Sequence, residues 1–183
     1  MQIIESDIPD VKILIPKQFG DARGFFSETY SRKTFAEHGI DMTFVQENHS
    51  LSVEKGVLRG LHYQIHPHAQ DKLVRVVRGT ILDVAVDIRR DSPTFGRHVK
   101  DVLSAENWRQ LLVPVGFAHG FVTLEANTEV LYKVTNFYAP DHERGLRWND
   151  PALDIDWSIP DDQVIMKDRD RDFPRLAEAV DLF

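Results

Sequence analysis

The sequence predicts an all-β fold, a sandwich or barrel of antiparallel strands with little helix. Short β-branched segments recur between turn signals, and no long helical segments alternate with them as they would in a βαβ fold. The length of 183 residues fits one domain. Hydrophobic residues make up 42% of the chain and charged residues 28%, a mixture that excludes an intrinsically disordered protein.

Nine segments are predicted as strands because each is rich in β-branched or aromatic residues and is bounded by turn residues. In chain order they are Val11–Ile15, Phe25–Tyr30, Val57–Ile65, Lys72–Arg78, Thr80–Ile88, His98–Leu103, Gln110–Val113, Gly120–Leu124 and Glu129–Tyr138. Two short helices are also predicted. One has Ser31 as its N-cap and runs to His38, before Gly39, and the other runs from Pro174 to Val180 with its proline in the first turn.

Charge and composition exclude several classes of function. The formal net charge of −7 provides no overall basic field for a nucleic acid, so an anionic ligand needs a local cluster of cations. The absence of cysteine excludes disulfides and thiol nucleophiles. No signal peptide and no apolar run of the ~20 residues that span a bilayer are found. We therefore expect a soluble, cytoplasmic protein that binds neither membranes nor nucleic acid.

Strand parity gives a first indication of a polar site. In the segment 72–78, Lys72, Val74, Val76 and Arg78 share one face of the predicted strand. A face that carries both apolar and charged groups suits the lining of a polar pocket and equally suits a wetted surface. Parity alone leaves both interpretations open.

The spacing of Gly60, His66, His68, Lys72 and Gly79 resembles the first cupin motif, although that motif has a glutamate where this chain has Lys72. The segment 114–119, Pro-Val-Gly-Phe-Ala-His, partly resembles the second motif. These resemblances imply a cupin-type jelly-roll barrel with a central pocket.

The presence of Lys72 determines whether a bound metal ion is expected. An ammonium repels a divalent cation and has no lone pair while it is protonated. A site of three histidines, His66, His68 and His119, remains the alternative, but Pro67 favours a loop at the first two. We therefore expect no metal and no other cofactor.

A more specific resemblance extends over nearly the whole chain. The segments that carry it are Asp21–Glu28, Phe44–Ser50, Gly56–Gln64, Lys72–Val76, Asp83–Arg89, Pro114–Phe121, Tyr132, Tyr138–Pro140 and Trp148–Pro151. In order and spacing they resemble the dTDP-4-dehydrorhamnose 3,5-epimerase family. The resemblance implies a single domain over residues 1–183, with the C-terminal segment of about 160–183 packing on the barrel.

Such an epimerase removes a proton from the carbon beside a sugar ketone and returns one to the opposite face. The resemblance implies that His62 is the base, since an unperturbed imidazole titrates near neutral pH. An aspartate shortly before Pro174 would hold the other ring nitrogen. We assign Asp170, but Asp168 and Asp172 also fit this pattern.

The same resemblance implies the remaining catalytic groups. Tyr132 would return the proton from the far face, because a phenol keeps its proton at neutral pH. Lys72 would direct an ammonium at the enolate oxygen, and His119 would lie close to the reacting sugar. A core tyrosine and a structural loop histidine are the alternative interpretations of Tyr132 and His119.

The nucleotide end of the substrate needs cations and aromatic surface. The resemblance implies that Arg23 and Arg59 bind the diphosphate. Arg59 and His62 lie on one face only if the strand is irregular at Gly60 or starts after it. Further ligand-contacting positions match Glu28, Gln46, Asn48, Glu143 and Arg169, and Phe19 and Tyr138 are candidates for stacking on thymine.

The expected reaction is epimerisation of dTDP-4-dehydro-6-deoxy-D-glucose at C3 and C5 to dTDP-4-dehydro-L-rhamnose. The resemblance also implies a homodimer with shared active sites, in which Arg23 and Glu28 would serve the other subunit. Three alternatives remain: a single-carbon epimerase or ketoisomerase of the same family, a metal-dependent cupin enzyme, and a catalytically silent sugar-nucleotide binding module.

Overall fold

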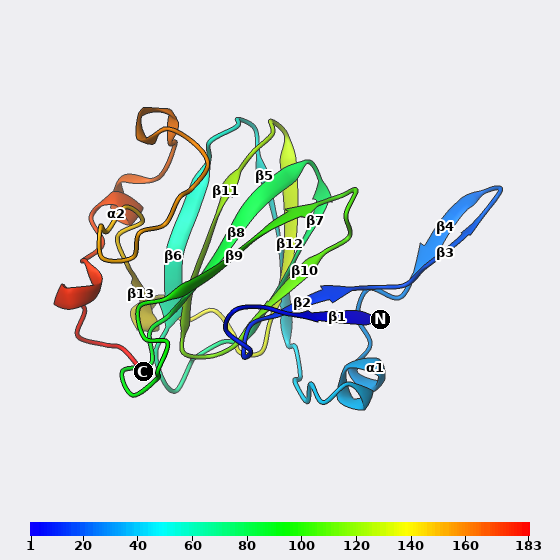
Figure 1. The fold of residues 1–183 in the computed structure, drawn as a ribbon, viewed down its shortest axis with the longest axis horizontal. Helices are drawn as coiled ribbons and strands as arrows, with labels where there is room; N and C mark the ends of the chain where they lie inside the picture. Colours follow the sequence, from blue (N-terminus) through cyan, green and yellow to red (C-terminus); the bar gives the residue numbers. More distant parts are fainter.

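Two antiparallel β-sheets face each other, and a separate hairpin projects from them (Figure 1). The computed structural model describes residues 1–183. The six-stranded sheet has the order β1 (Gln2–Glu5), β2 (Lys12–Ile15), β10 (Gln110–Val113), β7 (Lys72–Arg78), β12 (Thr128–Val134) and β5 (Gln46–Ser52). The five-stranded sheet has the order β13 (Glu143–Gly145), β6 (Leu58–Gln64), β11 (Phe117–Thr123), β8 (Thr80–Asp87) and β9 (His98–Ser104).

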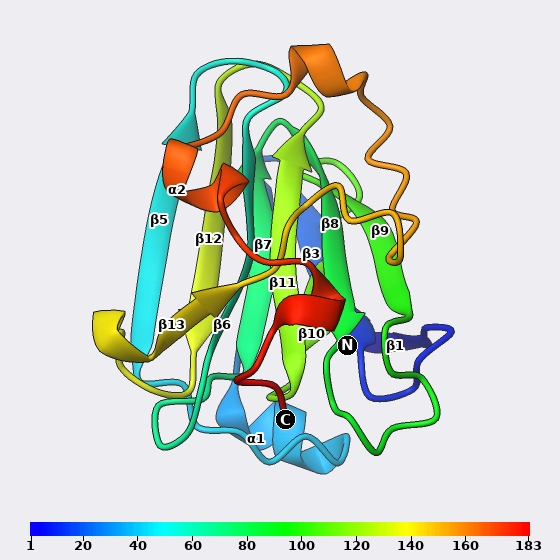
Figure 2. The same cartoon turned by 90° about the vertical axis from the view of Figure 1, so that its left-hand side faces the viewer.

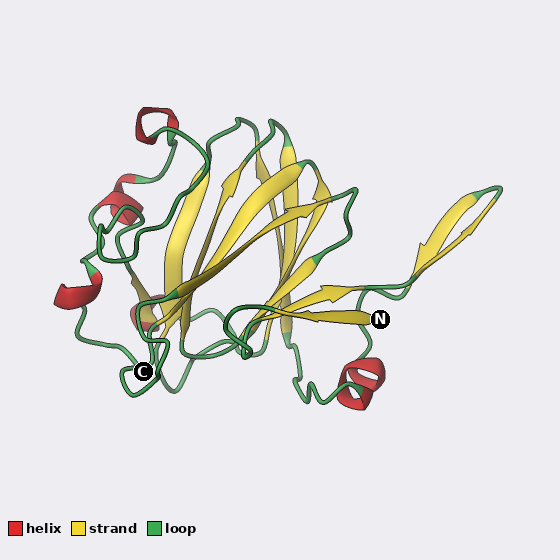
Figure 3. Cartoon of the chain, viewed as in Figure 1, coloured by secondary structure: helices red, strands yellow, loops and turns green.

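The projecting hairpin consists of β3 (Gln18–Asp21) and β4 (Gly24–Ser27), which pair only with each other. Helix is scarce (Figure 3). The α-helices are α1 (Arg32–Glu37) and α2 (Asp168–Arg171), and three 3₁₀ turns cover Pro140–His142, Asp161–Gln163 and Leu176–Glu178. None of the helices is long and apolar enough to cross a bilayer. The predicted all-β fold is confirmed.

The space between the sheets is filled by inward-facing apolar side chains of both sheets. They include Val74, Val76, Ile81, Ala85, Val99, Leu103, Leu111, Phe117, Phe121 and Val130. A second core lies on the outer face of the five-stranded sheet, where the chain after β13 crosses it (Figure 2). Trp157, Ile159 and Val164 pack there against that sheet, which holds the C-terminal segment on the barrel.

Most predicted strands and the first helix are confirmed, with bounds shifted by a few residues. The Ser31 side chain accepts a hydrogen bond from the backbone N–H of Thr34 and so caps α1, as predicted. Phe35 is the buried residue of that helix. Two strand predictions were too long, because β4 ends at Ser27 and β12 at Val134.

The predicted helix from Pro174 to Val180 is wrong. Only Leu176–Glu178 forms a 3₁₀ turn, because other parts of the chain bond the backbone of this segment. The N–H of Arg147 donates to the carbonyl of Pro174, and the N–H of Leu176 donates to Oδ2 of Asp150. These tertiary hydrogen bonds outweigh the weak helix propensity of a segment this short.

Strand β5 was missed because the sequence Gln-Glu-Asn-His-Ser-Leu-Ser has few β-branched or aromatic residues. Full pairing with β12, from Gln46 opposite Val134 to Ser52 opposite Thr128, makes it an edge strand of the six-stranded sheet. Its alternate residues Gln46, Asn48 and Ser50 share one face. A strand of polar residues is therefore explained by the sheet that it joins.

Candidate active site

An irregularity in β6 brings two predicted site residues to the same face of the strand. The register of β6 against β11 shifts between Phe121, which is opposite Arg59, and His119, which is opposite His62. Two residues of β6 are therefore accommodated beside one residue of β11, as in a β-bulge. This is the irregularity at Gly60 that the sequence hypothesis required.

Gly60 is the residue that makes this bulge possible. Its φ is +125°, a conformation that residues with a side chain rarely adopt. A Cβ at this position would lie 2.5 Å from Cα of Gly120 and 2.8 Å from the carbonyl oxygen of His119. The backbones of β6 and β11 therefore approach each other more closely here than any residue with a side chain would allow.

His62 is held by a buried carboxylate. Its Nε2 lies 3.0 Å from Oδ1 of Asp170, and Oδ2 of Asp170 accepts from the backbone N–H of Gly60. Nε2 has no hydrogen-bond partner of favourable geometry, so His62 and Asp170 are in contact without a well-formed hydrogen bond. Burial opposes ionisation of Asp170, but the combined effect of the neighbouring His62, the backbone N–H of Gly60 and the charge of Arg169 prevails and lowers the pKa of this carboxyl below its usual value. Asp170 therefore stays ionised beside the imidazole.

The competing aspartates are placed differently. Asp170 is buried on the short helix α2, whereas Asp168 and Asp172 are exposed. The rings of Phe173 and His62 pack edge to face, with 5.5 Å between centroids and 86° between planes. Of the three aspartates that the sequence left open, Asp170 is the one in contact with His62.

Lys72 connects the two sheets. It begins β7, and its Nζ donates to the backbone carbonyl of His62 at 3.2 Å. The residue is only 8% exposed, and burial lowers the pKa of its amine to about 8, although Glu143 and Asp83 act in the opposite direction. The ammonium is therefore present at neutral pH inside the barrel, close to the predicted base.

Tyr132 lies beside Lys72 on the inner face of the six-stranded sheet. Val74 is opposite Tyr132 and Val134 is opposite Lys72, which makes the tyrosine and the lysine diagonal neighbours. Burial raises the pKa of the Tyr132 phenol, and the positive charge of Arg59 only partly opposes this. The phenol thus holds its proton throughout the physiological range.

His119 faces the same interior, directly opposite His62 on the neighbouring strand. Its Nε2 lies 2.7 Å from Oδ1 of Asp83, a carboxylate with no exposed surface. Sequence reasoning missed Asp83 as a site residue. The sequence did contain a signal for Asp83, because it alternates with Ile81 and Ala85 on the inward face of β8. A buried aspartate among apolar residues needs a polar partner.

A second cluster of polar side chains lies around Glu143, the first residue of β13. Glu143 forms an ion pair with Arg169 of α2 and accepts a hydrogen bond from the Tyr138 hydroxyl at 3.0 Å. Burial opposes ionisation of Glu143, but Arg169, His62 and Tyr138 together prevail and lower the pKa of the carboxyl. Gln46 and Asn48 are hydrogen-bonded to each other, and Oε1 of Gln46 accepts from the backbone N–H of Tyr138. These predicted ligand contacts therefore form one connected group.

Three predicted residues are not brought to the barrel interior. Phe19 is on β3, and Arg23, at the turn of the projecting hairpin, pairs with Asp21 and is almost fully exposed. Glu28 follows the hairpin and accepts a hydrogen bond from Thr34. Phe19 and Glu28 instead line a small cavity of about 160 Å³ beside α1. Within one chain, these residues do not contact the group around His62.

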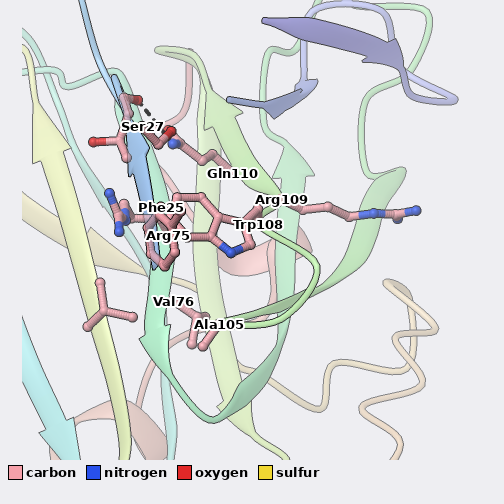
Figure 4. A pocket seen from close by; sticks show the side chains of 10 residues that line it. Phe25, Ser27, Arg75, Val76, Ala105, Trp108, Arg109 and Gln110 are labelled. Carbon is pink, nitrogen blue, oxygen red and sulfur yellow. Dashed lines mark hydrogen bonds between the residues drawn. The ribbon is translucent and has the colours of Figure 1, made fainter. Parts of the chain in front are cut away.

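A larger cavity, of about 520 Å³, lies at the base of the hairpin and not at the predicted site. Figure 4 shows Phe25 lying against Trp108 in its wall. Arg75 and Gln110 also line it, but none of the sequence-predicted site residues does. We place the candidate active site by its chemistry, in the barrel interior around His62.

The alternative metal site is not assembled. No group of three His, Cys, Asp or Glu side chains lies close enough to hold a metal ion. The ring of His66 packs edge-on with Phe183 and that of His68 lies tilted against His142, whereas His119 contacts Asp83. The three histidines of the alternative are therefore engaged in separate contacts.

A carboxylate-backed imidazole, a protonated phenol and a buried ammonium project from facing sheets of a cupin-like jelly roll. The fold and the site thus define a β-barrel protein whose interior groups are suited to acid and base catalysis. The chain belongs to the dTDP-4-dehydrorhamnose 3,5-epimerase family, whose sequence model matches residues 5–178. The predicted resemblance is confirmed.

Individual relatives match over almost their whole length. A dTDP-4-dehydrorhamnose 3,5-epimerase from Shigella flexneri is 52% identical over 180 residues, which cover 98% of each chain. The crystal structure of the Bacillus anthracis enzyme with TDP and pyrophosphate bound has a TM-score of 0.92 and 49% identity, over 95% of this chain and 98% of that one. The Legionella pneumophila enzyme, in complex with dTDP-4-keto-L-rhamnose, has a TM-score of 0.92 and 47% identity, over 97% and 93%.

Proposed function

We propose that this protein epimerises dTDP-4-dehydro-6-deoxy-D-glucose at C3 and C5 to give dTDP-4-dehydro-L-rhamnose, in the synthesis of dTDP-L-rhamnose. The observation that carries the proposal is the contact of His62 with Asp170 next to the buried ammonium of Lys72. The names of the relatives support the same reaction. We place the reaction in the cytoplasm.

The proposed first step is proton removal by His62. Asp170 contacts Nε2, so the other ring nitrogen takes the proton from the carbon beside the ketone. The ionised Asp170 then stabilises the imidazolium that forms. A base near neutral pH with a fixed orientation suits a weakly acidic carbon.

The negative charge that develops on the ketone oxygen is stabilised by Lys72. Because the amine is buried, its charge acts in a medium of low dielectric constant and is worth more than it would be in water. His119, opposite His62 on β11, is the second group proposed to contact the sugar. No metal ion or other cofactor is required by this scheme.

Inversion requires a proton donor on the other side of the sugar. Tyr132 projects from the six-stranded sheet, whereas His62 projects from the facing five-stranded sheet. The phenol keeps its proton because burial raises its pKa. Abstraction by His62 and return by Tyr132 would invert C5 and C3 in turn, provided that between the two inversions His62 loses its added proton to solvent and Tyr132 regains one from solvent.

The nucleotide is proposed to bind where Arg59, Gln46, Asn48, Tyr138, Glu143 and Arg169 surround the reacting group. Tyr138 is exposed and offers a ring for stacking on thymine. The bulge at Gly60 places Arg59 on the same side of β6 as His62. Arg59 can therefore meet the diphosphate while His62 meets the sugar.

We further propose a homodimer in which the β3–β4 hairpin reaches the partner's active site. The hairpin projects from its own barrel (Figure 1), and its Phe25 and Phe26 are 62% and 70% exposed. Exposed aromatic rings on a hairpin that pairs with no other strand are a feature of surfaces that a partner chain covers. Phe19, Arg23 and Glu28 would then complete the substrate site of the other subunit.

The reaction is tested by incubation with dTDP-4-dehydro-6-deoxy-D-glucose in deuterium oxide, followed by NMR at C3 and C5. We expect deuterium at both carbons together with formation of the L-rhamno product. Exchange at one carbon alone would identify a single-carbon epimerase. Tight binding of the nucleotide sugar with no exchange would identify a binding module, and activity that a chelator abolishes would identify a metal-dependent enzyme.

The shared site is tested by mixing two inactive variants, Arg23→Ala and His62→Ala, under conditions that exchange subunits. If Arg23 serves the partner, a mixed dimer contains one site with both residues intact and activity returns. If each site is built from one chain, both sites of the mixed dimer are defective and activity stays lost. A monomer in a sizing measurement would remove the dimer proposal altogether.

A further inference from the structure

Strands β8 and β9 place two carboxylates directly opposite each other. Asp83 and Asp101 are register partners in this antiparallel pair. Their neighbours Ile81, Val99 and Leu103 belong to the core between the sheets, so both aspartates point into that core. Residues opposite each other in such a pair have Cβ atoms about 4.5 to 5.5 Å apart.

Each of these carboxylates has one satisfied and one unsatisfied oxygen. Oδ1 of Asp83 accepts from His119 at 2.7 Å, and Oδ1 of Asp101 accepts from Arg109 at 2.7 Å. Oδ2 of Asp83 and Oδ2 of Asp101 are both buried with no hydrogen-bond donor. Buried acceptors without a donor are uncommon in folded proteins, and two on facing residues call for a common explanation.

A fully satisfied carboxylate on the same strand provides a comparison. Asp87 is also buried, but its oxygens accept from Arg89, Ser92 and Thr94. No comparable set of donors surrounds Asp83 and Asp101. One proton, carried by one carboxyl and bonded to the other, would give both free oxygens a hydrogen-bond partner.

Electrostatics favour the same arrangement. Two ionised carboxylates side by side in a buried position repel each other, and one of them then keeps its proton. The titratable and charged groups facing the pair are His119 on β11, Lys72 on β7 and Arg109 after β9. Burial raises the pKa of Asp101, while Arg109 and the backbone N–H of Val102 act in the opposite direction, and the negative charge of Asp83 adds a smaller increase.

We propose that Asp83 and Asp101 share one proton at neutral pH, and that Asp101 is a positioning residue that acts on His119 through Asp83. The shared proton gives each free oxygen a hydrogen-bond partner. It also fixes the orientation in which the Asp83 carboxylate accepts a hydrogen bond from His119. The effect on catalysis rests on the proposed function, since it requires His119 to contact the sugar. The shared proton itself does not.

Arg109 extends this line of hydrogen bonds to the surface. Its side chain is 38% exposed and donates to Asp101. Figure 4 shows this side chain extending away from Phe25 and Trp108, so its charged end does not fill the cavity at the hairpin. A continuous line thus runs from solvent through Arg109, Asp101 and Asp83 to His119.

Infrared spectroscopy of the substrate-free protein at pH 7 tests the shared proton. We expect a carbonyl stretching band of one protonated carboxyl in the wild type, and loss of that band in both Asp83→Asn and Asp101→Asn. Asp91→Asn, a change at an exposed aspartate, should leave the band in place. Absence of the band from the wild type, or its survival in Asp101→Asn, would overturn the proposal whatever reaction the protein catalyses.

Kinetics test the positioning role. Asp101→Leu removes the donor to Asp83, and we expect kcat to fall by about tenfold with KM little changed, the factor that corresponds to about 1.4 kcal/mol of barrier. Asp101→Asn still offers an N–H to Asp83 and an oxygen to Arg109, so its kcat should fall less. Equal kcat values for the two variants would contradict a role through Asp83.

Discussion

Lys72 is expected to reduce the stability of the fold in return for its proposed role at the ketone oxygen. Burial lowers the pKa of its amine from 10.5 to about 8. Since one pKa unit corresponds to about 1.4 kcal/mol, keeping the buried amine protonated at pH 7 costs about 3 kcal/mol. Because Lys72 is 8% exposed, solvent screens this cost little. We therefore expect Lys72→Met to raise the free energy of unfolding while it lowers kcat by about 100- to 1,000-fold.

The sign of the pH dependence follows from proton linkage. Between pH 8 and 10.5 the unfolded chain binds the lysine proton and the folded protein has largely released it. Stability rises with pH wherever the unfolded state binds more protons. The wild type should therefore gain about 3 kcal/mol relative to Lys72→Met as the pH rises through this window.

Urea denaturation at several pH values between 7 and 10.5 measures this difference for the two proteins. Groups other than Lys72 cancel in the comparison, and the packing of the methionine adds an offset that does not depend on pH. Lys55→Met, at an exposed lysine, serves as the control and should show no such pH dependence relative to the wild type. A constant difference between wild type and Lys72→Met across the window would refute the reasoning.

Three further predictions concern the base, the acid and the bulge. The Tyr132→Phe variant should still exchange the substrate protons through His62 but return them without inversion. NMR should therefore show deuterium in unepimerised substrate and at least a hundredfold less product, since acid catalysis usually contributes ~10² or more. Equal loss of exchange and of product would contradict separate roles for the two residues. Asp170→Asn should lower kcat by at least about a hundredfold, whereas Asp168→Asn should match the wild type, and similar rates for both would remove the assignment of Asp170. Gly60→Ala should lower the free energy of unfolding by about 3 kcal/mol in denaturation experiments, and Gly24→Ala, at a similar φ with no atom within 4 Å of the added Cβ, should cost much less.

Negative charges in the interior help this barrel to hold the buried ammonium of Lys72. Glu143 and Asp83 both raise the pKa of Lys72 and so partly offset its burial. Each of these carboxylates has a partner of its own: Glu143 forms an ion pair with Arg169, and Asp83 accepts a hydrogen bond from His119. The position of one lysine thus depends on carboxylates from two other strands.

The strands of the central sheets were predictable because their residues alternate or cluster in a way that only a pleated, half-buried surface accommodates. Lys72–Arg78 and Gln110–Val113 have the predicted bounds. Strand β5 was not predictable by the same reasoning, since its polar residues have no strand preference of their own. The segment 174–180 failed for the opposite reason, because its local preference for helix was overridden by hydrogen bonds to distant residues.

The sequence by itself determined the chemical inventory of the site: a histidine, a tyrosine, a lysine and an aspartate within recognisable segments, in a chain without cysteine and with a turn-rich β pattern. Only the tertiary structure decided which aspartate serves His62, that the strand irregularity places Arg59 beside it, and that Asp83 and Asp101 face each other. The physical reason is that residue type and strand parity are local properties. Register, burial and the pairing of charges arise between strands that are far apart in the chain.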